Sequence, residues 1–322
     1  MIINEKNIKL WSTIGPRATF GLMSLDLVKE IENLMILTCD VSTSAGLDRF
    51  RKNFPDNYLD LGIAEQNMIG VAAGLASEGY NVVTTTFAPF QTARCCEQIK
   101  VNAGYMRQKI CMVGIASGLV LGNLGFTHCA IEDVGILRSI PNIDIISPAD
   151  SLETVKSVEA ALKSKKSCYI RLTGSSNNPI VNKKDYNFEI GKSVKLMNGS
   201  DVTIFASGAA VYDSILAAKI LSDQNISCSV INMHTIKPID QFAIEDACKN
   251  SKLLISVEEH NIIGGLGSAI SEVTSSLANT PRLVRIGVID NYSKGGSYEH
   301  LKEKHGLTPD KIVETIFKNY KN

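Results

Sequence analysis

Short apolar runs alternate with helix-length stretches along most of the chain, and this alternation predicts strands that are each followed by a helix. The runs are continuously apolar, as in residues 110–115, which is typical of strands buried on both faces of a parallel sheet. We therefore expect an α/β fold class in which helices cover both faces of mainly parallel sheets. The predicted strands are 34–39, 81–86, 110–115, 143–147, 168–172, 202–206, 227–232, 252–257 and 283–287.

The same pattern predicts two domains joined by a linker. Periodicity is lost over residues 173–195, which are polar and contain glycine and proline. We predict a first domain over residues 1–178, a linker over 179–195 and a second domain over 196–322. The predicted helices are 18–32, 62–79, 90–103, 131–139, 151–162, 209–223, 240–249, 268–277 and 311–319.

Composition and charge narrow the possible partners. Hydrophobic residues make up 44% of the 322 residues, which is enough to fill two ordinary cores. The 33 basic and 33 acidic residues cancel and form no Lys/Arg-rich block, so we expect neither nucleic acid nor membrane as the main partner. Residues 110–131 lack a charged side chain, but their glycines, together with Asn123 and His128, favour a buried strand and a loop over a membrane helix.

The eight cysteines are scattered and form no C-x-x-C pair, and no export signal is visible at the start of the chain. A reducing, cytoplasmic location is therefore expected. Neither His/Cys nor multi-carboxylate clusters have metal-ligand spacing, because Glu258-Glu259-His260 is too compressed to surround an ion. The glycines at 264–267 form only a weak dinucleotide-binding pattern, which a tight strand-to-helix turn explains better.

The most informative chemistry lies at the start of the predicted helix 62–79. Glu65 is the only charged residue there before Glu78, so we expect it to be buried. Such a carboxylate can complement the helix dipole, or it can exchange a proton with a ring nitrogen beside it. The strand that follows ends in Thr86-Phe87-Ala88-Pro89-Phe90, where Phe90 could cover a flat heterocycle.

This stretch resembles the pyrimidine-binding domain of the transketolase family. The similar features are Gly62-Ile63-Ala64-Glu65, a polar pair, an apolar helix, a strand and the TF-x-x-F turn. The resemblance implies thiamine diphosphate as cofactor, with Glu65 bonded to its aminopyrimidine ring and driving the tautomer change that ionises the thiazolium carbon. It also implies that Phe87 and Phe90 surround the ring, with Phe90 as its stacking partner.

Other segments extend the resemblance over nearly the whole chain. Residues 231–240, 258–260 and 264–269 resemble the transketolase C-terminal domain. The loop 122–128 resembles the family's glycine-rich loop, which implies that His128 faces the substrate in an acid–base or hydrogen-bonding role. This chain has Leu124 and Ala116 where many transketolases have a substrate aspartate and histidine, so a different substrate specificity is expected.

Two arginines are candidates for binding a sugar phosphate. Arg17 precedes the first predicted helix and matches a substrate-phosphate arginine of the family, and Arg171 lies at the end of a predicted strand. A guanidinium group offers a planar fork that suits phosphate or carboxylate. A surface salt bridge is the alternative for each arginine.

The chain lacks the Gly-Asp-Gly segment by which the family holds the diphosphate through a divalent cation. The resemblance then implies one subunit of a split enzyme, with Mg²⁺ (or Ca²⁺) held mainly by an N-terminal transketolase subunit and with two copies of each chain. The implied reaction transfers a two-carbon ketol unit from a ketose or ketose phosphate to an aldehyde. A decarboxylating enzyme related to deoxyxylulose phosphate synthase or to 2-oxo-acid dehydrogenase β-subunits, or a subunit without catalysis, remains an alternative.

Overall fold

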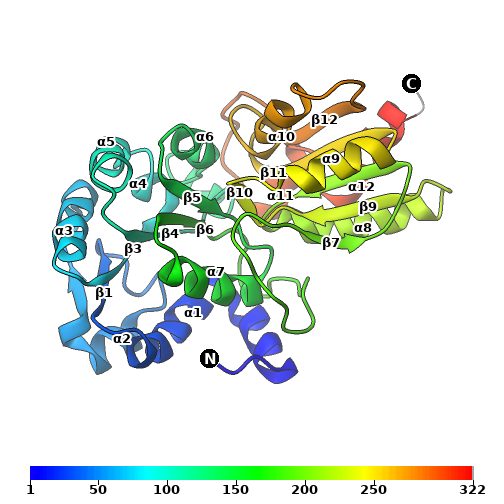
Figure 1. The fold of residues 1–322 in the computed structure, drawn as a ribbon. Coiled ribbons are helices and arrows are strands. Elements are labelled where there is room, and N and C mark those ends of the chain that lie inside the picture. Colours follow the sequence, from blue (N-terminus) through cyan, green and yellow to red (C-terminus); the bar gives the residue numbers. More distant parts are fainter. Residues whose placement is uncertain (321–322) are drawn as a thin grey trace.

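The computed structural model describes residues 1–320 and contains two α/β units side by side (Figure 1). The first described unit is built on a seven-stranded sheet in which all pairs are parallel except the one at the β10 edge. In spatial order its strands are β10 (Thr235–Lys237), β5 (Ile143–Ile146), β6 (Ser167–Arg171), β4 (Ile110–Ile115), β3 (Asn81–Phe87), β1 (Leu34–Thr38) and β2 (Tyr58–Asp60).

The second unit is built on a five-stranded sheet within the described residues. Its pairs are parallel apart from the antiparallel pair at the β7 edge. The predicted α/β fold class, with two mainly parallel sheets, is thus confirmed. In spatial order the strands are β12 (Arg282–Val288), β11 (Leu253–Asn261), β8 (Val202–Ala206), β9 (Cys228–Asn232) and β7 (Val194–Met197).

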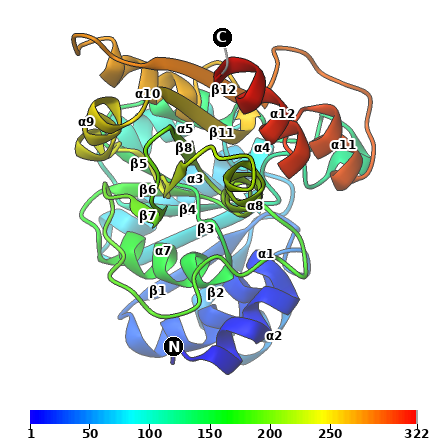
Figure 2. The same cartoon turned by 90° about the vertical axis from the view of Figure 1, so that its right-hand side faces the viewer.

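Helices cover both faces of the first sheet. One face packs against α1 (Glu5–Glu30), α2 (Asp48–Asn53) and α7 (Ser151–Lys163), and Figure 2 shows α1 and α7 next to each other. The other face packs against α3 (Glu65–Ser77), α4 (Ala88–Gln91), α5 (Cys96–Ile99), a π-helical segment (Lys100–Tyr105) and α6 (Asp133–Arg138).

Side chains of a single strand enter both cores, which explains why the strands are continuously apolar. In β4, Cys111 and Val113 join the core beneath α1 and α7, whereas Ile110 and Met112 join the core beneath α3. Consecutive side chains of a strand point to opposite faces of the sheet. When helices cover both faces, every side chain of the strand is buried, and apolar residues are favoured at all positions. A central strand of a sheet with helices on both faces therefore appears in the sequence as an unbroken apolar run.

The second sheet is covered in the same way. In β11, Leu253 and Ile255 pack towards the core that contains α8 and α12, whereas Leu254 packs towards α9 and α10. The helices of this unit are α8 (Ala210–Ser222), α9 (Gln241–Asn250), α10 (Leu266–Thr274), α11 (Tyr298–Lys304) and α12 (Pro309–Tyr320).

The two units share a sheet. Strand β10 lies within the predicted second domain, yet it pairs antiparallel with β5, with Thr235 opposite Ile146. The predicted strands do not include β10, β2 or β7, because three- or four-residue strands at sheet edges carry little periodic signal. The chain after β9 therefore returns to the first sheet before it completes the second unit.

The first helix is longer than predicted and is broken at Gly15. Gly15 has φ 81° and ψ 172°, a positive φ that favours glycine, and the second segment starts with Pro16. A Cβ atom on Gly15 would lie 2.6 Å from the carbonyl oxygen of Ser175, so the position also requires a residue without a side chain. The prediction found the segment after this break and missed the one from Glu5 to Ile14.

The predicted continuous helix over 90–103 is wrong. After α4 the chain turns, and side chains satisfy carbonyl groups that helical N–H groups would otherwise bind. The Gln66 amide donates to the carbonyl oxygen of Arg94 at 3.0 Å, and the Cys95 thiol contacts that of Phe90 at 3.1 Å. This turn gives the segment after Phe90 a shape that periodicity alone does not predict.

Within residues 1–320, no helix combines the length and the apolar character needed to span a bilayer. All eight cysteines are free, and most of them are buried.

Candidate active site

The predicted site residues of the first unit gather at one edge of its sheet. Strands β1, β2, β3 and β4 are parallel, so their carboxyl ends lie at the same edge. Glu65 follows β2, Phe87 and Phe90 lie at and after the end of β3, and His128 lies in the loop after β4. The carboxyl edge of a parallel sheet is where α/β proteins place their binding sites.

Phe87, Phe90 and His128 form a small aromatic cluster at this edge. The Phe90 and His128 ring centroids are 5.3 Å apart at an interplanar angle of 73°. Phe87 lies 6.3 Å from each of the other two rings, also edge to face. The Nδ1 atom of His128 is 3.0 Å from the hydroxyl oxygen of Thr127, which leaves the ring otherwise open on a half-buried loop.

Glu65 is buried, as the sequence predicts, with 4% of its surface exposed. It is the first residue of α3, where its carboxylate also complements the positive end of the helix dipole. Its Oε1 atom accepts a hydrogen bond from an Nη atom of Arg94 at 2.7 Å. The carboxylate therefore faces the segment that follows Phe90.

Arg94 is the residue of this site that sequence reasoning missed. Its guanidinium carbon lies 4.0 Å from the centre of the Phe90 ring while its Nη donates to Glu65. Arg94 follows Phe90 by four residues, a spacing that brings side chains together in a helix. That spacing was the available signal, but the chain turns between the two residues and the contact depends on the turn.

The contacts of Arg94 show which kind of group can bind between Glu65 and Phe90. A planar, positively charged group with N–H donors fits against the face of Phe90 and within hydrogen-bond distance of Glu65. An aminopyrimidine ring is also planar and nitrogen-bearing, so these residues fit the pyrimidine end of thiamine diphosphate. Within residues 1–320, no group of three or more His, Cys, Asp or Glu side chains could hold a metal ion.

Arg17 lies at the same edge through the packing of α1 against the loop after β1. A Cβ atom on Gly21 would be 2.1 Å from the carbonyl oxygen of Gly46, so the helix and this loop are in backbone contact. Arg17 is half-buried and has no hydrogen bond or ion pair within residues 1–320, and burial lowers the pKa of its guanidinium. An apolar groove of about 420 Å³ runs along α1 and is lined by the next residue, Ala18, but not by Arg17.

Arg171 does not lie in an open site. Its side chain is 3% exposed, and its Nε atom donates to both carboxylate oxygens of Asp133 at 2.8 and 3.0 Å. One Nη atom donates to the carbonyl oxygens of Ala130 and Glu259 at 2.8 and 2.7 Å. Because Glu259 belongs to the second unit, this arginine joins the two units, and the expected substrate contact of Arg171 is not supported.

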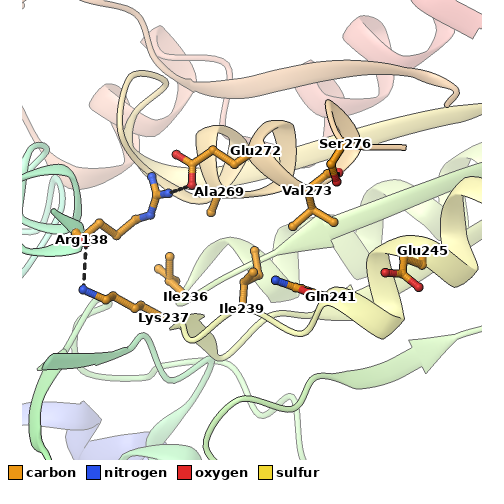
Figure 3. Close-up of a pocket in the computed structure, with 10 residues that line it drawn as sticks. All are labelled: Arg138, Ile236, Lys237, Ile239, Gln241, Glu245, Ala269, Glu272, Val273 and Ser276. Carbon is orange, nitrogen blue, oxygen red and sulfur yellow. Dashed lines mark hydrogen bonds and ion pairs between the residues drawn. The ribbon is translucent and has the colours of Figure 1, made fainter. Parts of the chain in front are cut away.

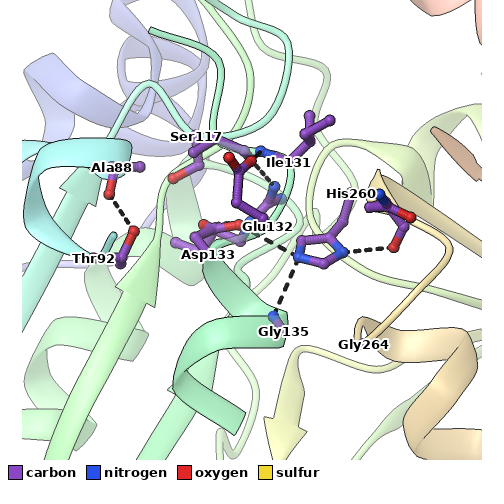
Figure 4. Close-up of polar contacts among 12 residues, drawn as sticks. Ala88, Thr92, Ser117, Ile131, Glu132, Asp133, Gly135, His260 and Gly264 are labelled. Atoms are coloured by element: carbon purple, nitrogen blue, oxygen red, sulfur yellow. Dashed lines mark hydrogen bonds and ion pairs between the residues drawn. The ribbon is translucent and has the colours of Figure 1, made fainter. Parts of the chain in front are cut away.

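The motif Glu258-Glu259-His260 lies in the same junction. The Gly135 N–H donates to Nε2 of His260 at 3.3 Å, as Figure 4 shows, and burial lowers the pKa of His260 to about 4. Glu258 accepts backbone N–H groups at the start of α10 at 2.6 and 2.8 Å, and burial raises its pKa to about 7. These residues connect the domains and form no metal site.

A separate cavity of about 330 Å³ opens between the two units (Figure 3). None of the predicted site residues lines it. Three of its charged side chains are engaged in contacts between segments, since Arg138 donates to Glu272 at 2.5 Å and Lys237 donates to the carbonyl oxygens of Arg138 and Ile140. This cavity is part of the domain junction.

Two family models match the chain and cover most of its length. The model "Transketolase, pyrimidine binding domain" matches residues 13–178, and the model "Transketolase, C-terminal domain" matches residues 191–312. The first match contains Glu65, Phe90 and His128.

Individual relatives and a solved structure agree with these models. A 6-deoxy-6-sulfo-D-fructose transketolase subunit of a Clostridium species is 35% identical over 92% of this chain and 92% of its own length. An apulose-4-phosphate transketolase subunit from Actinobacillus succinogenes is 36% identical over 90% of this chain and 93% of its own length. A structure described as a split gene transketolase, an inactive β4 tetramer, has a TM-score of 0.87 and 34% identity over 95% of this chain and 98% of that one.

Proposed function

The chain belongs to the transketolase family, and from this premise we propose that it is the pyrimidine-domain subunit of a split transketolase. The proposed enzyme transfers a two-carbon ketol unit from a ketose or ketose phosphate to an aldehyde, and it requires a second subunit. The single observation that carries the proposal is the corner formed by Glu65 and Phe90, which already receives a planar cation. When bound, thiamine diphosphate supplies the nucleophilic carbon and holds the electron pair left by carbon–carbon cleavage.

Each residue of the site has a proposed task towards the cofactor or the substrate. Glu65 exchanges a proton with a pyrimidine ring nitrogen, because a buried carboxylate held at one position can hydrogen-bond a group placed on Phe90. Phe90 stacks on the ring, and Phe87 supports Phe90 edge-on. His128 lies at the edge of the same ring and is proposed to donate to or accept from a substrate oxygen.

Arg17 is the proposed anionic-group receptor. Of the two arginines expected to bind substrate, Arg17 has no partner in the described part of the chain, whereas Arg171 already binds Asp133 and two backbone carbonyl groups. A partly buried guanidinium without a carboxylate is suited to a phosphate or a similar anion. Leu124, which is 54% exposed in the loop that carries His128, supports a specificity different from that of enzymes with an aspartate there.

The partner is proposed to be an N-terminal transketolase subunit that holds the diphosphate and Mg²⁺, in an assembly with two copies of each chain. The open face of α3 supports contacts of this kind. Cβ atoms on Gly70 and Gly74 would meet nothing within 4 Å, and Ile63 just before the helix is 78% exposed. Small residues on an exposed helix face let another backbone approach closely. The eight free cysteines support a reducing, cytoplasmic location.

The test combines this chain with its N-terminal partner and follows thiamine diphosphate by titration calorimetry in the presence of Mg²⁺. We expect binding only in the mixture, followed by ketol transfer from a panel of ketoses. Glu65→Gln should lower ketol transfer by about 10²–10⁴-fold, the usual contribution of a positioned acid–base group. Glu78→Gln, an exposed carboxylate at the end of the same helix, is the matched control and should change little.

Different outcomes identify different errors. Full ketol transfer by the Glu65→Gln complex would contradict the proposed role of Glu65. Tight binding of thiamine diphosphate by this chain alone would contradict the split site. Turnover of a 2-oxo acid in place of any ketose would favour the decarboxylating alternative.

A further inference from the structure

We propose that Arg94 occupies the pyrimidine position while the site is empty and that the cofactor binds by displacing it. This inference rests on the proposed function of the site. Arg94 would then be a positioning residue, which keeps Glu65 paired and Phe90 covered until the ring arrives.

The geometry points to a shared position because Arg94 uses both groups assigned to the ring. One Nη atom donates to Glu65 at 2.7 Å, and the guanidinium carbon lies 4.0 Å from the centroid of Phe90. A pyrimidine ring stacked on the same face of Phe90 and bonded to Glu65 would need the space of the guanidinium. The two groups therefore compete.

The exposure of the two partners shows which one can leave. The side chain of Arg94 is 42% exposed, whereas that of Glu65 is 4% exposed. Water solvates the exposed guanidinium once the pair opens, so Arg94 itself loses little by leaving. A displaced Arg94 can turn into solvent, but Glu65 cannot, and a buried carboxylate without a partner is costly. Arg94 therefore supplies the missing partner only while the ring is absent.

The backbone beneath Arg94 is held in place, so displacement requires only the side chain to move. The Gln66 amide donates to the carbonyl oxygen of Arg94 at 3.0 Å, and the next residue, Cys95, is buried with its thiol 3.1 Å from the carbonyl oxygen of Phe90. Rotation of an exposed side chain is fast compared with backbone rearrangement. Phe90 and Glu65 can thus keep their positions while Arg94 leaves.

The test measures the Kd of thiamine diphosphate, with Mg²⁺, in the assembled complex with the N-terminal partner. Arg94→Ala removes the competitor and should tighten binding about five-fold, the range of a half-exposed ion pair with a cation–π contact. Arg94→Lys, which keeps the charge without the planar fork, should give an intermediate Kd. Arg51→Ala is the matched control, because Arg51 is 52% exposed, pairs with Asp48 at 3.4 Å and contacts no site residue.

A second readout follows Arg94 itself in the wild-type complex. Phenylglyoxal labels accessible guanidinium groups, and mass spectrometry can locate the label. Saturation with thiamine diphosphate should make Arg94 react faster, since the displaced guanidinium is no longer paired with Glu65 or stacked on Phe90.

The outcomes separate this inference from the proposed function. Slower labelling of Arg94 on cofactor binding, or weaker binding by Arg94→Ala, would mean that Arg94 stays with Glu65 in the loaded site, and the inference would be wrong. An unchanged Kd in Arg94→Ala would also overturn it. If the wild-type complex bound no thiamine diphosphate at all, the proposed function would fail and this inference with it.

Discussion

Two arginine–carboxylate pairs of similar chemistry differ in how completely they are satisfied. Arg94 makes one hydrogen bond to Glu65 and is 42% exposed. Arg171 binds both oxygens of Asp133 and two backbone carbonyl groups, and its side chain is 3% exposed. Tyr169 donates a further hydrogen bond to Asp133 at 2.7 Å.

The comparison teaches that two properties of the arginine, the number of its hydrogen bonds and its solvent exposure, distinguish a structural ion pair from one that can exchange partners. A buried pair that loses one member leaves an uncompensated charge in a low-dielectric environment. A pair with one exposed member can exchange that member for another donor, provided that the buried carboxylate is never left alone. The Arg171 pair therefore fastens the two units together, whereas the Arg94 pair can give way to a ligand.

The largest effect should come from breaking the buried pair. Arg171→Ala leaves Asp133 buried without its cation, so we expect the free energy of unfolding to fall by about 3–5 kcal/mol. Chemical denaturation followed by circular dichroism would measure the loss. Arg51→Ala, at an exposed pair, should change stability by no more than about 0.5 kcal/mol.

Full stability of the Arg171→Ala variant would contradict the structural role assigned to the Arg171–Asp133 pair. A stable variant whose KM for a sugar phosphate had risen strongly would instead restore the substrate role that the sequence suggested for this arginine.

A smaller effect should come from the open site. Phe90→Ala removes the stacking face, and loss of stacking between a ring and an aromatic side chain costs about 1–3 kcal/mol by analogy with base stacking. The Kd of thiamine diphosphate in the assembled complex should therefore rise about 5–150-fold. Phe87→Leu, which removes only edge contacts to Phe90 and His128, should weaken binding less. Equal losses in both variants would mean that the cluster acts by packing alone.

The smallest effect concerns pH and His260 in the buried junction. Burial lowers the pKa of His260 from 6.5 to about 4, so between these values the unfolded chain binds more protons at this residue than the folded chain. The contribution of neutral His260 is thus present above pH 6.5 and is lost as the pH falls towards 4. The stability difference between wild type and His260→Gln should shrink by about 1 kcal/mol between pH 6.5 and pH 5.5.

Two carboxylates face His260, with Asp133 at 3.8 Å and Glu258 at 3.9 Å, and both are present in wild type and variant. The raised pKa of Glu258, about 7, acts on stability in the opposite direction in this range. The difference in the free energy of unfolding between wild type and His260→Gln therefore reports, to first order, the contribution of His260 alone. A difference that stayed constant with pH would show that His260 is not held neutral by the junction.

Much of the fold could be predicted because local rules and burial agree. Residues 110–115 are apolar at every position, and the strand is found there without correction. The helix at Glu65 and its burial were also predictable, since a lone charge in an apolar segment has few other places to lie. The break at Gly15 and the turn after Phe90 were missed, because each depends on a contact with a distant segment.

The sequence by itself determined the α/β alternation, the family and the placement of Glu65, Phe90 and His128 at the sheet edge, because periodicity and short motifs are local properties. Only the tertiary structure decided what the arginines do. Arg17, Arg94 and Arg171 are equally charged in the sequence, yet one is unpaired in the described chain, one covers Phe90 and one is buried between the units. The physical reason is that the free energy of a charge depends on its solvent exposure and its partners, and both are set by segments far apart in the chain.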